Sequence, residues 1–139
     1  MNSERPVGRT NLLLIFLLLY GAASLFHYAH NAEFLGDYPN LPAGLSPALI
    51  YGAWLGGTAV GVAGYLLFRR GYSLVGLAVL GVYGVLGLDG LGHYGLAPFS
   101  GHKFTMNFSI LLEAATAVVL LTTVVGLMLR HLRTGRLGK

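Results

Sequence analysis

Four long apolar stretches, separated by short polar segments, dominate the sequence. They cover residues 11–28, 47–68, 73–94 and 104–129. Each stretch has roughly 18 to 26 residues, and a helix of that length crosses about 30 Å of hydrocarbon at 1.5 Å per residue. The pattern therefore predicts an all-α integral membrane protein with four transmembrane helices.

Local signals support the boundaries of the second stretch. Ser46 precedes Pro47, which is the order expected for an N-cap followed by proline at the first helical position. Arg69-Arg70-Gly71 ends the stretch with two cations and a glycine. For residues 11–28 the competing interpretation is a signal peptide, but no small-x-small cleavage site follows the run. We therefore expect the first stretch to be a membrane anchor like the other three.

Composition agrees with a membrane protein. Of the 139 residues, 55% are hydrophobic and only 10% are charged, whereas about a quarter of the residues in a soluble domain are charged. The chain has no cysteine, which excludes disulfides, thiolate metal sites and cysteine nucleophiles. We expect a single four-span domain over residues 1–139, with the lipid bilayer solvating most of its surface.

The positive charges indicate an orientation. With four spans, nearly all of the basic residues fall on one side of the membrane, namely Arg5, Arg9, Arg69, Arg70, Arg130, Arg133, Arg136 and Lys139. Lys103 falls on the other side. By the positive-inside rule the fold is an antiparallel bundle with both termini cytoplasmic, multi-pass in the inner (plasma) membrane. Loops 30–44 and 96–103 then face the periplasmic, extracytoplasmic side. The net charge of +4 does not indicate nucleic acid, because the basic residues lie in short patches at membrane boundaries.

Glycines recur at spacings that favour close helix packing. The third stretch has them at 81, 84, 87 and 90, and the second has them at 52 with 56 and at 57 with 61. Small residues at these spacings let helix backbones approach where lipid provides no hydrophobic drive for association. We also expect a chain this small and glycine-rich to form a homo-oligomer or to join a larger membrane complex.

The segment 88–113 carries unusual polar residues. It contains Asp89, His93, His102 and Glu113. An aspartate at the centre of a membrane helix costs at least about 2.5 kcal/mol, so such a residue is by default a functional candidate. Glu113 is nine residues into the fourth stretch, or about 13 Å deep if that stretch is helical.

Spacing suggests how these residues form a site. His27 and His30 are three residues apart, and Asp89 and His93 are four apart, so each pair is expected on one helix face. Bundles build metal sites from side chains on facing helices, and imidazole and carboxylate suit Zn, Fe and Cu(II). We expect a divalent transition metal as cofactor and Glu113 as the catalytic residue. Glu113 can act as a general base, as a metal ligand or as a partner that fixes a histidine tautomer. The predicted metal ligands are His27, His30, Asp89, His93 and His102.

Other residues can complete the cavity. Tyr51, Trp54 and Thr58 share one face of the second stretch and can line it. Asn31, Glu33, Asp37 and Tyr38 in the first outer loop can cap the site. The alternative for that loop is a solvated turn built around Gly36, Pro39 and Pro42.

Three classes of function fit these observations. The favoured one is a membrane metalloenzyme near the extracytoplasmic face, either a metal-dependent hydrolase or an oxidoreductase acting on a lipid-soluble substrate. The second is a haem-binding electron-transfer subunit, with His27 or His30 and His93 as the axial ligands. The third is a non-catalytic small subunit or carrier of a membrane complex. The inner halves of the spans have few polar residues, which counts against a transporter.

Overall fold

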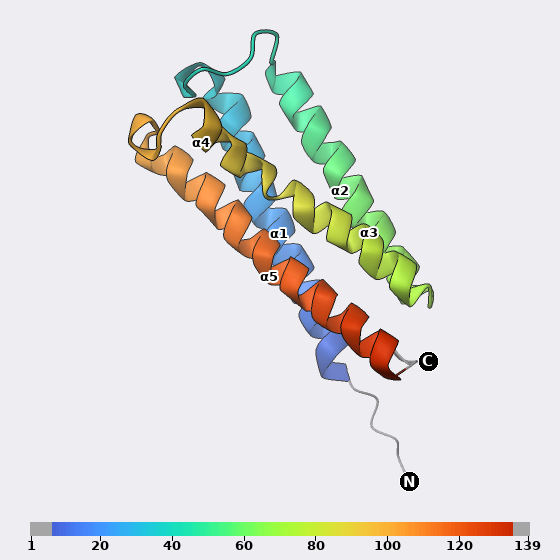
Figure 1. The fold of residues 1–139 in the computed structure, drawn as a ribbon. Coiled ribbons are helices and arrows are strands. Elements are labelled where there is room, and N and C mark those ends of the chain that lie inside the picture. Colours follow the sequence, from blue (N-terminus) through green and yellow to red (C-terminus); the bar gives the residue numbers. More distant parts are fainter. Residues whose placement is uncertain (1–6, 135–139) are drawn as a thin grey trace.

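The computed structural model describes residues 7–134, which form helices joined by short turns (Figure 1). The long helices are α1 (Val7–Glu33), α2 (Pro47–Arg69), α3 (Ser73–Leu86) and α5 (Phe104–Thr134). The short ones are η1 (Leu35–Asp37), η2 (Asp89–Gly92), α4 (His93–Leu96) and η3 (Phe99–Gly101). Segments 34–46 and 97–103 lie together at one end of the molecule, which we call the loop end. The turn at 70–72 lies at the opposite end.

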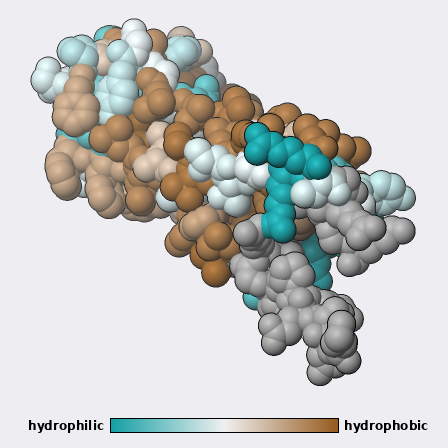
Figure 2. All heavy atoms as spheres, turned by 60° about the horizontal axis from the view of Figure 1, so that its bottom comes forward, coloured by the Kyte–Doolittle hydropathy of each residue, from teal (hydrophilic) through white to brown (hydrophobic). Residues whose placement is uncertain are grey.

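Four helices in the described part of the chain are long and apolar enough to cross a membrane. They are Asn11–Glu33, Pro47–Arg69, Ser73–Leu96 and Phe104–Thr134. Large hydrophobic side chains such as Leu18, Leu55 and Val82 are exposed along them, and hydrophobic residues cover much of the surface seen in Figure 2. The prediction of four apolar helices of membrane-spanning length is therefore confirmed.

A buried core joins α1, α3 and α5. Its members are Leu13, Tyr20, Leu77, Leu80, Tyr83, Ala117, Leu120 and Val124. The N-cap predicted for the second helix is also present, because the backbone N–H of Leu49 donates to Ser46 Oγ at 3.3 Å. The core fills the middle of the molecule and leaves the loop end for polar side chains.

Glycines hold α2 against α3 at the end away from the loops. A methyl group on Gly64 would lie 2.9 Å from the backbone nitrogen of Leu80, and one on Gly76 would collide with the backbone of α2. The predicted close packing is confirmed at Gly61, where a methyl group would meet the Tyr83 ring at 2.6 Å. At Gly52 and Gly56 added methyl groups would have no neighbour within 4 Å, so these two glycines do not pack on another helix of the described chain. The two helices therefore touch at one end and separate toward the loop end.

The third span is not one continuous helix, contrary to the prediction for residues 73–94. Its α-helix ends at Leu86, and the N–H groups of Gly87 and Leu88 bond to the carbonyls three residues earlier. Glycine is a poor helix former, and this segment has three of them between residues 87 and 92. In a 3₁₀ turn, residues four apart are offset by about 120°. The prediction that Asp89 and His93 share a face is therefore wrong: His93 is buried and Asp89 is exposed.

Candidate functional site

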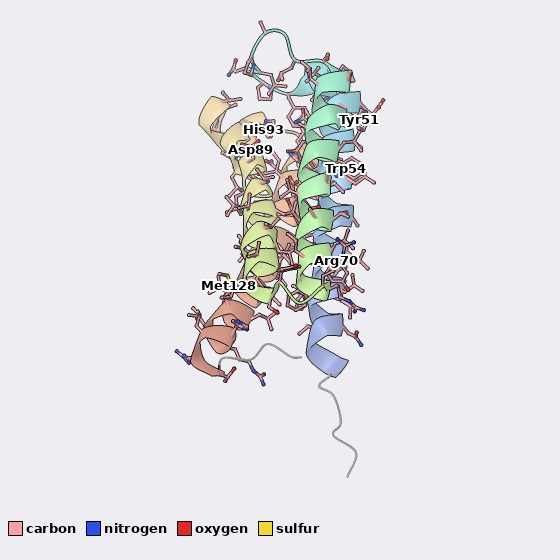
Figure 3. All side chains as sticks on the ribbon, turned by 90° about the vertical axis from the view of Figure 1, so that its right-hand side faces the viewer. Tyr51, Trp54, Arg70, Asp89, His93 and Met128 are labelled. Atoms are coloured by element: carbon pink, nitrogen blue, oxygen red, sulfur yellow. The ribbon has the colours of Figure 1, made fainter. Side chains whose placement is uncertain are left out.

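Four predicted site residues gather inside the loop end, and we call them the histidine–glutamate cluster. They are His27 on α1, His93 on α4, His102 after η3 and Glu113 on α5. The ring centres of His27 and His93 are 5.6 Å apart, and those of His93 and His102 are 6.2 Å apart. Figure 3 shows His93 near the loop end, with Arg70 and Met128 near the opposite end. All four side chains are buried.

A serine fixes the His27 ring. His27 Nδ1 is 3.1 Å from Ser109 Oγ, and the Ser109 hydroxyl itself donates to the carbonyl of Met106 at 2.9 Å. Because the hydroxyl proton is used in that bond, Ser109 accepts from Nδ1–H. The Nε2 atom of a neutral His27 then carries a lone pair. The structure thus places an unprotonated imidazole nitrogen on the inside of the bundle.

That lone pair faces Glu113, a carboxylate with 1% of its surface exposed. His27 Nε2 and Glu113 Oε2 are 3.7 Å apart, which is too far for a direct hydrogen bond. Ser24 is close enough to interact with the carboxylate, yet neither oxygen has a partner at hydrogen-bond distance. Leaving a buried polar group unpaired costs about 1–3 kcal/mol, and more for a charged one. Glu113 is therefore the residue whose position most needs an explanation.

The backbone of η2 closes one side of this pair. A methyl group on Gly90 would lie 3.1 Å from His27 Nε2 and 3.3 Å from Glu113 Oε2. A side chain at residue 90 would therefore press on both atoms. The break in the third span places a glycine at this point, which leaves the volume beside the two atoms open.

His93 is held by Asn31 near the end of α1 and by Tyr38, which follows η1. Its Nε2 is 3.3 Å from the side-chain amide of Asn31, and the ring of Tyr38 packs on it with centres 4.9 Å apart. The Nδ1 atom of His93 and the Oδ1 atom of Asn31 are buried without partners. Of the four residues predicted to cap a site, Asn31 and Tyr38 contact His93, whereas Glu33 bonds to Tyr51 and Asp37 to Lys103. That they cap a functional site stays a prediction.

His102 has the same kind of orientation as His27. Its Nδ1–H donates to the carbonyl of Pro98 at 3.0 Å, which leaves Nε2 with the lone pair. That Nε2 atom is buried and has no partner. Asn107, whose amide donates to the carbonyls of Phe99 and His102, fixes the surrounding loop.

His30 lies beside the cluster and is held by Tyr38. The two side chains are hydrogen-bonded, with 2.8 Å between His30 Nδ1 and the Tyr38 hydroxyl. Burial raises the pKa of the Tyr38 phenol above its ordinary value, so the hydroxyl is protonated at neutral pH and can donate to the imidazole. In this arrangement His30 positions the tyrosine that packs on His93.

Asp89 lies outside the cluster. It is exposed and lines a separate groove that also contains Ser24, Tyr28 and Trp54. The rotation introduced by the 3₁₀ turn directs Asp89 into this groove, while His93 turns into the cluster.

The side chains of the cluster are not arranged as a complete set of metal ligands. Among residues 7–134, no three His, Asp or Glu side chains are arranged so that they could already hold a metal ion. The arrangement instead has one close pair, His27 and Glu113, with His93 and His102 farther out. His93 is on a four-residue helix and His102 on a loop, so neither is fixed within a long helix.

Sequence reasoning did not assign roles to Ser24 and Asn107. Both are buried polar residues in otherwise apolar helices, which is the signal that could have identified them. Ser24 is three residues before His27 and is therefore on the same helix face. Asn107 anchors the His102 loop through the carbonyls of Phe99 and His102. The position of these carbonyls cannot be inferred from the spacing of residues in the sequence.

Comparison with protein-family models, curated proteins and solved structures gave no match. The geometry of the site is therefore the basis for assigning a function.

Proposed function

We propose that this chain is a multi-pass protein of the inner membrane and that its loop end faces the extracytoplasmic side. Four helices of spanning length with exposed hydrophobic side chains support insertion in a bilayer. The exposed arginines at 69, 70, 130 and 133 lie at the end of the molecule away from the loops, at or just after the last turn of α2 and in the last turns of α5. At the loop end, the described residues include one lysine, Lys103, and no arginine. This asymmetry supports an antiparallel bundle with both termini in the cytoplasm.

We further propose that the histidine–glutamate cluster binds a divalent transition metal. The observation that carries this proposal is the orientation of the imidazoles: His27 and His102 each use Nδ1–H in a hydrogen bond to protein oxygen. Metal-ligating histidines nearly always donate their second N–H in this way, which fixes the tautomer and directs the lone pair at the metal. In both residues the lone pair falls on a buried Nε2 atom.

The close pair has a separation that one metal ion can bridge. Two ligands about 2.1 Å from a common ion are 3.7 Å apart when the angle at the metal is about 125°. His27 Nε2 and Glu113 Oε2 are separated by that distance. A shift of His93 or His102 toward His27 and Glu113 then adds a third metal ligand. A metal would also give the buried Glu113 oxygens a cation to bind, and neither oxygen has a protein partner at hydrogen-bond distance among the described residues.

The site that results fits an enzyme, either a hydrolase or an oxidoreductase. Imidazole with carboxylate suits Zn, Fe or Cu, which supply Lewis-acid or redox chemistry. Glu113 has two oxygens, so one can face the metal while the other accepts a proton. Ser24, which interacts with Glu113 and lines the groove containing Asp89, connects the carboxylate to a surface that faces lipid. A lipid-soluble substrate is therefore favoured.

Metal analysis with an absorption spectrum on detergent-purified protein tests the proposal. The preparations are wild type, Glu113→Gln, the double variant His27→Ala/His93→Ala, and His131→Ala as a control at the far end of α5. Each is incubated with Zn²⁺, Cu²⁺ or Fe²⁺, dialysed and checked for helix content. We expect one metal per chain in wild type and in His131→Ala, and its loss in the double variant.

Two results would overturn the metal proposal. One is folded wild-type protein that retains none of the three metals after dialysis. The other is equal metal retention in the double variant and wild type. A Soret band in the purified protein would instead indicate a haem ligated by these histidines.

A further inference from the structure

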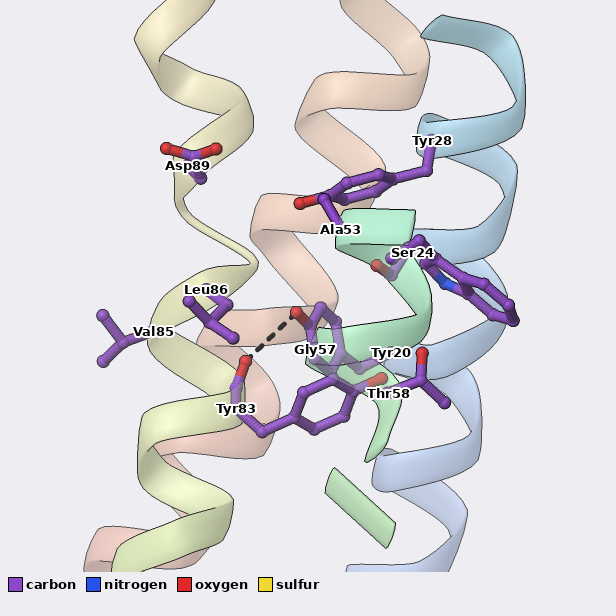
Figure 4. A pocket seen from close by; sticks show the side chains of 11 residues that line it. Tyr20, Ser24, Tyr28, Ala53, Gly57, Thr58, Tyr83, Val85, Leu86 and Asp89 are labelled. Carbon is purple, nitrogen blue, oxygen red and sulfur yellow. Dashed lines mark hydrogen bonds between the residues drawn. The ribbon is translucent and has the colours of Figure 1, made fainter. Parts of the chain in front are cut away.

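A lateral groove lies between α1, α2 and the end of α3, beside the histidine–glutamate cluster. It has a volume of about 460 Å³, within the range of about 300–1,000 Å³ that is usual for small-molecule sites. It exists because α2 and α3 touch through Gly64 and Gly76 but separate toward the loop end, where Gly52 and Gly56 have no neighbour. Figure 4 shows the side chains that line it.

The groove is rich in aromatic rings. Tyr20, Tyr28, Trp54 and Tyr83 all line it. Tyr20 is fixed because its hydroxyl donates to the carbonyl of Tyr83 at 3.1 Å, shown as the dashed line in Figure 4. Aromatic rings favour offset-stacked or edge-to-face contact with another flat ring. The walls therefore suit a planar, unsaturated group better than a saturated chain alone.

Two polar atoms in the groove wall have no partner at hydrogen-bond distance among the described residues. Trp54 Nε1 and Thr58 Oγ1 are buried without hydrogen bonds. Asp89 of η2 and Tyr28 of α1 also line the groove, and both are labelled in Figure 4. A ligand with oxygen atoms at two edges of a ring can accept from Trp54 N–H at one edge. At the other edge, a ligand hydroxyl can donate to the Asp89 carboxylate, and a ligand carbonyl can accept from the Tyr28 hydroxyl.

The charge in the groove excludes one common class of occupant. None of the eleven residues that line it is Lys, Arg or His, and Asp89 carries the acidic group. A phospholipid phosphate would meet a carboxylate and no cation, which is unfavourable in a lipid-facing site. The lining therefore favours a neutral head group over an anionic one.

We propose that this groove binds a lipid-soluble quinone or quinol: a flat ring with carbonyl or hydroxyl oxygens at opposite edges and an apolar tail that extends into the bilayer. Binding rests on the groove residues alone. The role of the ligand as substrate rests on the proposed function, because Ser24 joins the groove to Glu113.

The chain provides its own reporter for this binding. Trp54 is the single tryptophan of the sequence and lines the groove, so quinone binding there will quench the intrinsic tryptophan fluorescence. The experiment titrates full-length protein in detergent with a benzoquinone bearing a ten-carbon alkyl tail. Competitors are an alkylbenzene with the same tail and no ring oxygens, a sterol, and phosphatidylglycerol.

Two matched variants localise the signal. Ala53 lines the groove and Ala59 is exposed elsewhere on α2, so Ala53→Leu fills the groove whereas Ala59→Leu adds the same volume outside it. We expect saturable quenching with one site in wild type and in Ala59→Leu. In Ala53→Leu we expect affinity at least about tenfold weaker, the size of effect that added methylenes have in a closed pocket. The alkylbenzene, the sterol and phosphatidylglycerol should not compete.

Quenching that rises linearly and equally in both variants would overturn the proposal, because it reports partition into the micelle. Competition by the alkylbenzene, the sterol or phosphatidylglycerol at the quinone's own affinity would also overturn it and identify a general lipid crevice. Metal content is measured on the same preparations. Loss of quinone binding in Ala53→Leu with metal retained separates failure of the groove from failure of the metal site.

Discussion

Replacing Gly90 with alanine adds one methyl group where the backbone of η2 passes the His27–Glu113 pair. The new carbon would lie 3.1 Å from His27 Nε2 and 3.3 Å from Glu113 Oε2, two atoms that are themselves 3.7 Å apart. From those three distances, the carbon is about 2.6 Å from the midpoint of the line between the two atoms. A bridging ion bound at about 2.1 Å from each ligand lies within ~1 Å of that midpoint. Around that line, an ion on the side of residue 90 would be only about 1.6 Å from the methyl carbon, and one on the far side would be about 3.6 Å from it. The methyl group would therefore exclude a metal or its bound water from the side that faces η2, and it would press on both side-chain atoms.

Gly90→Ala should have a large effect on metal affinity and a small effect on global stability. Moving the ligand atoms by a few tenths of an ångström should weaken metal affinity by at least about 10–100-fold, as disturbed outer-shell contacts do. Global stability should change by less than ~2 kcal/mol, because steric strain in a packed interior costs about 1–3 kcal/mol and alanine regains about 1 kcal/mol of helix propensity over glycine. The variant should fold and lose metal.

The assay is metal content after dialysis against a graded chelator series, with circular dichroism in detergent as the folding check. Gly92→Ala is the matched control on the same short helix, because its methyl group would have no neighbour within 4 Å. Equal metal affinity in wild type, Gly90→Ala and Gly92→Ala would refute the placement of the ion between His27 and Glu113.

Three further predictions concern residues around the site and the fold. Ser109→Ala removes the acceptor for His27 Nδ1–H. It should weaken metal affinity about 10–100-fold in a chelator competition. Unchanged affinity would show that Ser109 does not fix the tautomer of His27. Gly76→Ala forces apart α2 and α3 and should lower the stability in detergent by ~2 kcal/mol or more. Gly56→Ala, whose methyl group has no neighbour within 4 Å, should not lower it. Equal melting temperatures for the two variants would contradict the close approach of α2 and α3. Burial raises the Tyr38 pKa, so the folded state binds more protons than the unfolded state above the ordinary phenol pKa of about 10, and stability falls as pH rises from there toward the raised pKa. Stability measured from pH 8 to 11 should therefore fall less in Tyr38→Phe than in wild type, and parallel curves would argue against a buried phenol.

Much of the fold was predictable because it depends on local signals. The apolar stretches set the four helices, and the Ser46-Pro47 pair placed the start of α2 at the observed residue. The break after Leu86 was not predicted. A glycine at every third position is compatible with both a packed helix and an interrupted one, and the hydropathy of residues 73–96 stays high through the break.

The site was predictable in part for the same reason. Clustering of His27, His93, His102 and Glu113 followed from their common position near one end of the spans. The directions of the side chains could not be predicted from the sequence. The 3₁₀ turn rotates Asp89 away from the cluster, and the carbonyl of Pro98 orients the His102 ring. The groove beside the cluster depends on the divergence of α2 from α3, which arises from contacts between residues distant in sequence.

X-ray absorption spectroscopy of the metal-loaded, detergent-purified protein would show directly which residues bind the metal. The proposal predicts a first shell of nitrogen and oxygen at about 2.0–2.2 Å, with the multiple-scattering signature of at least two imidazoles that weakens in the His27→Ala/His93→Ala variant. A first shell of oxygen alone, or an imidazole signal unchanged in that variant, would contradict metal binding by the histidine–glutamate cluster.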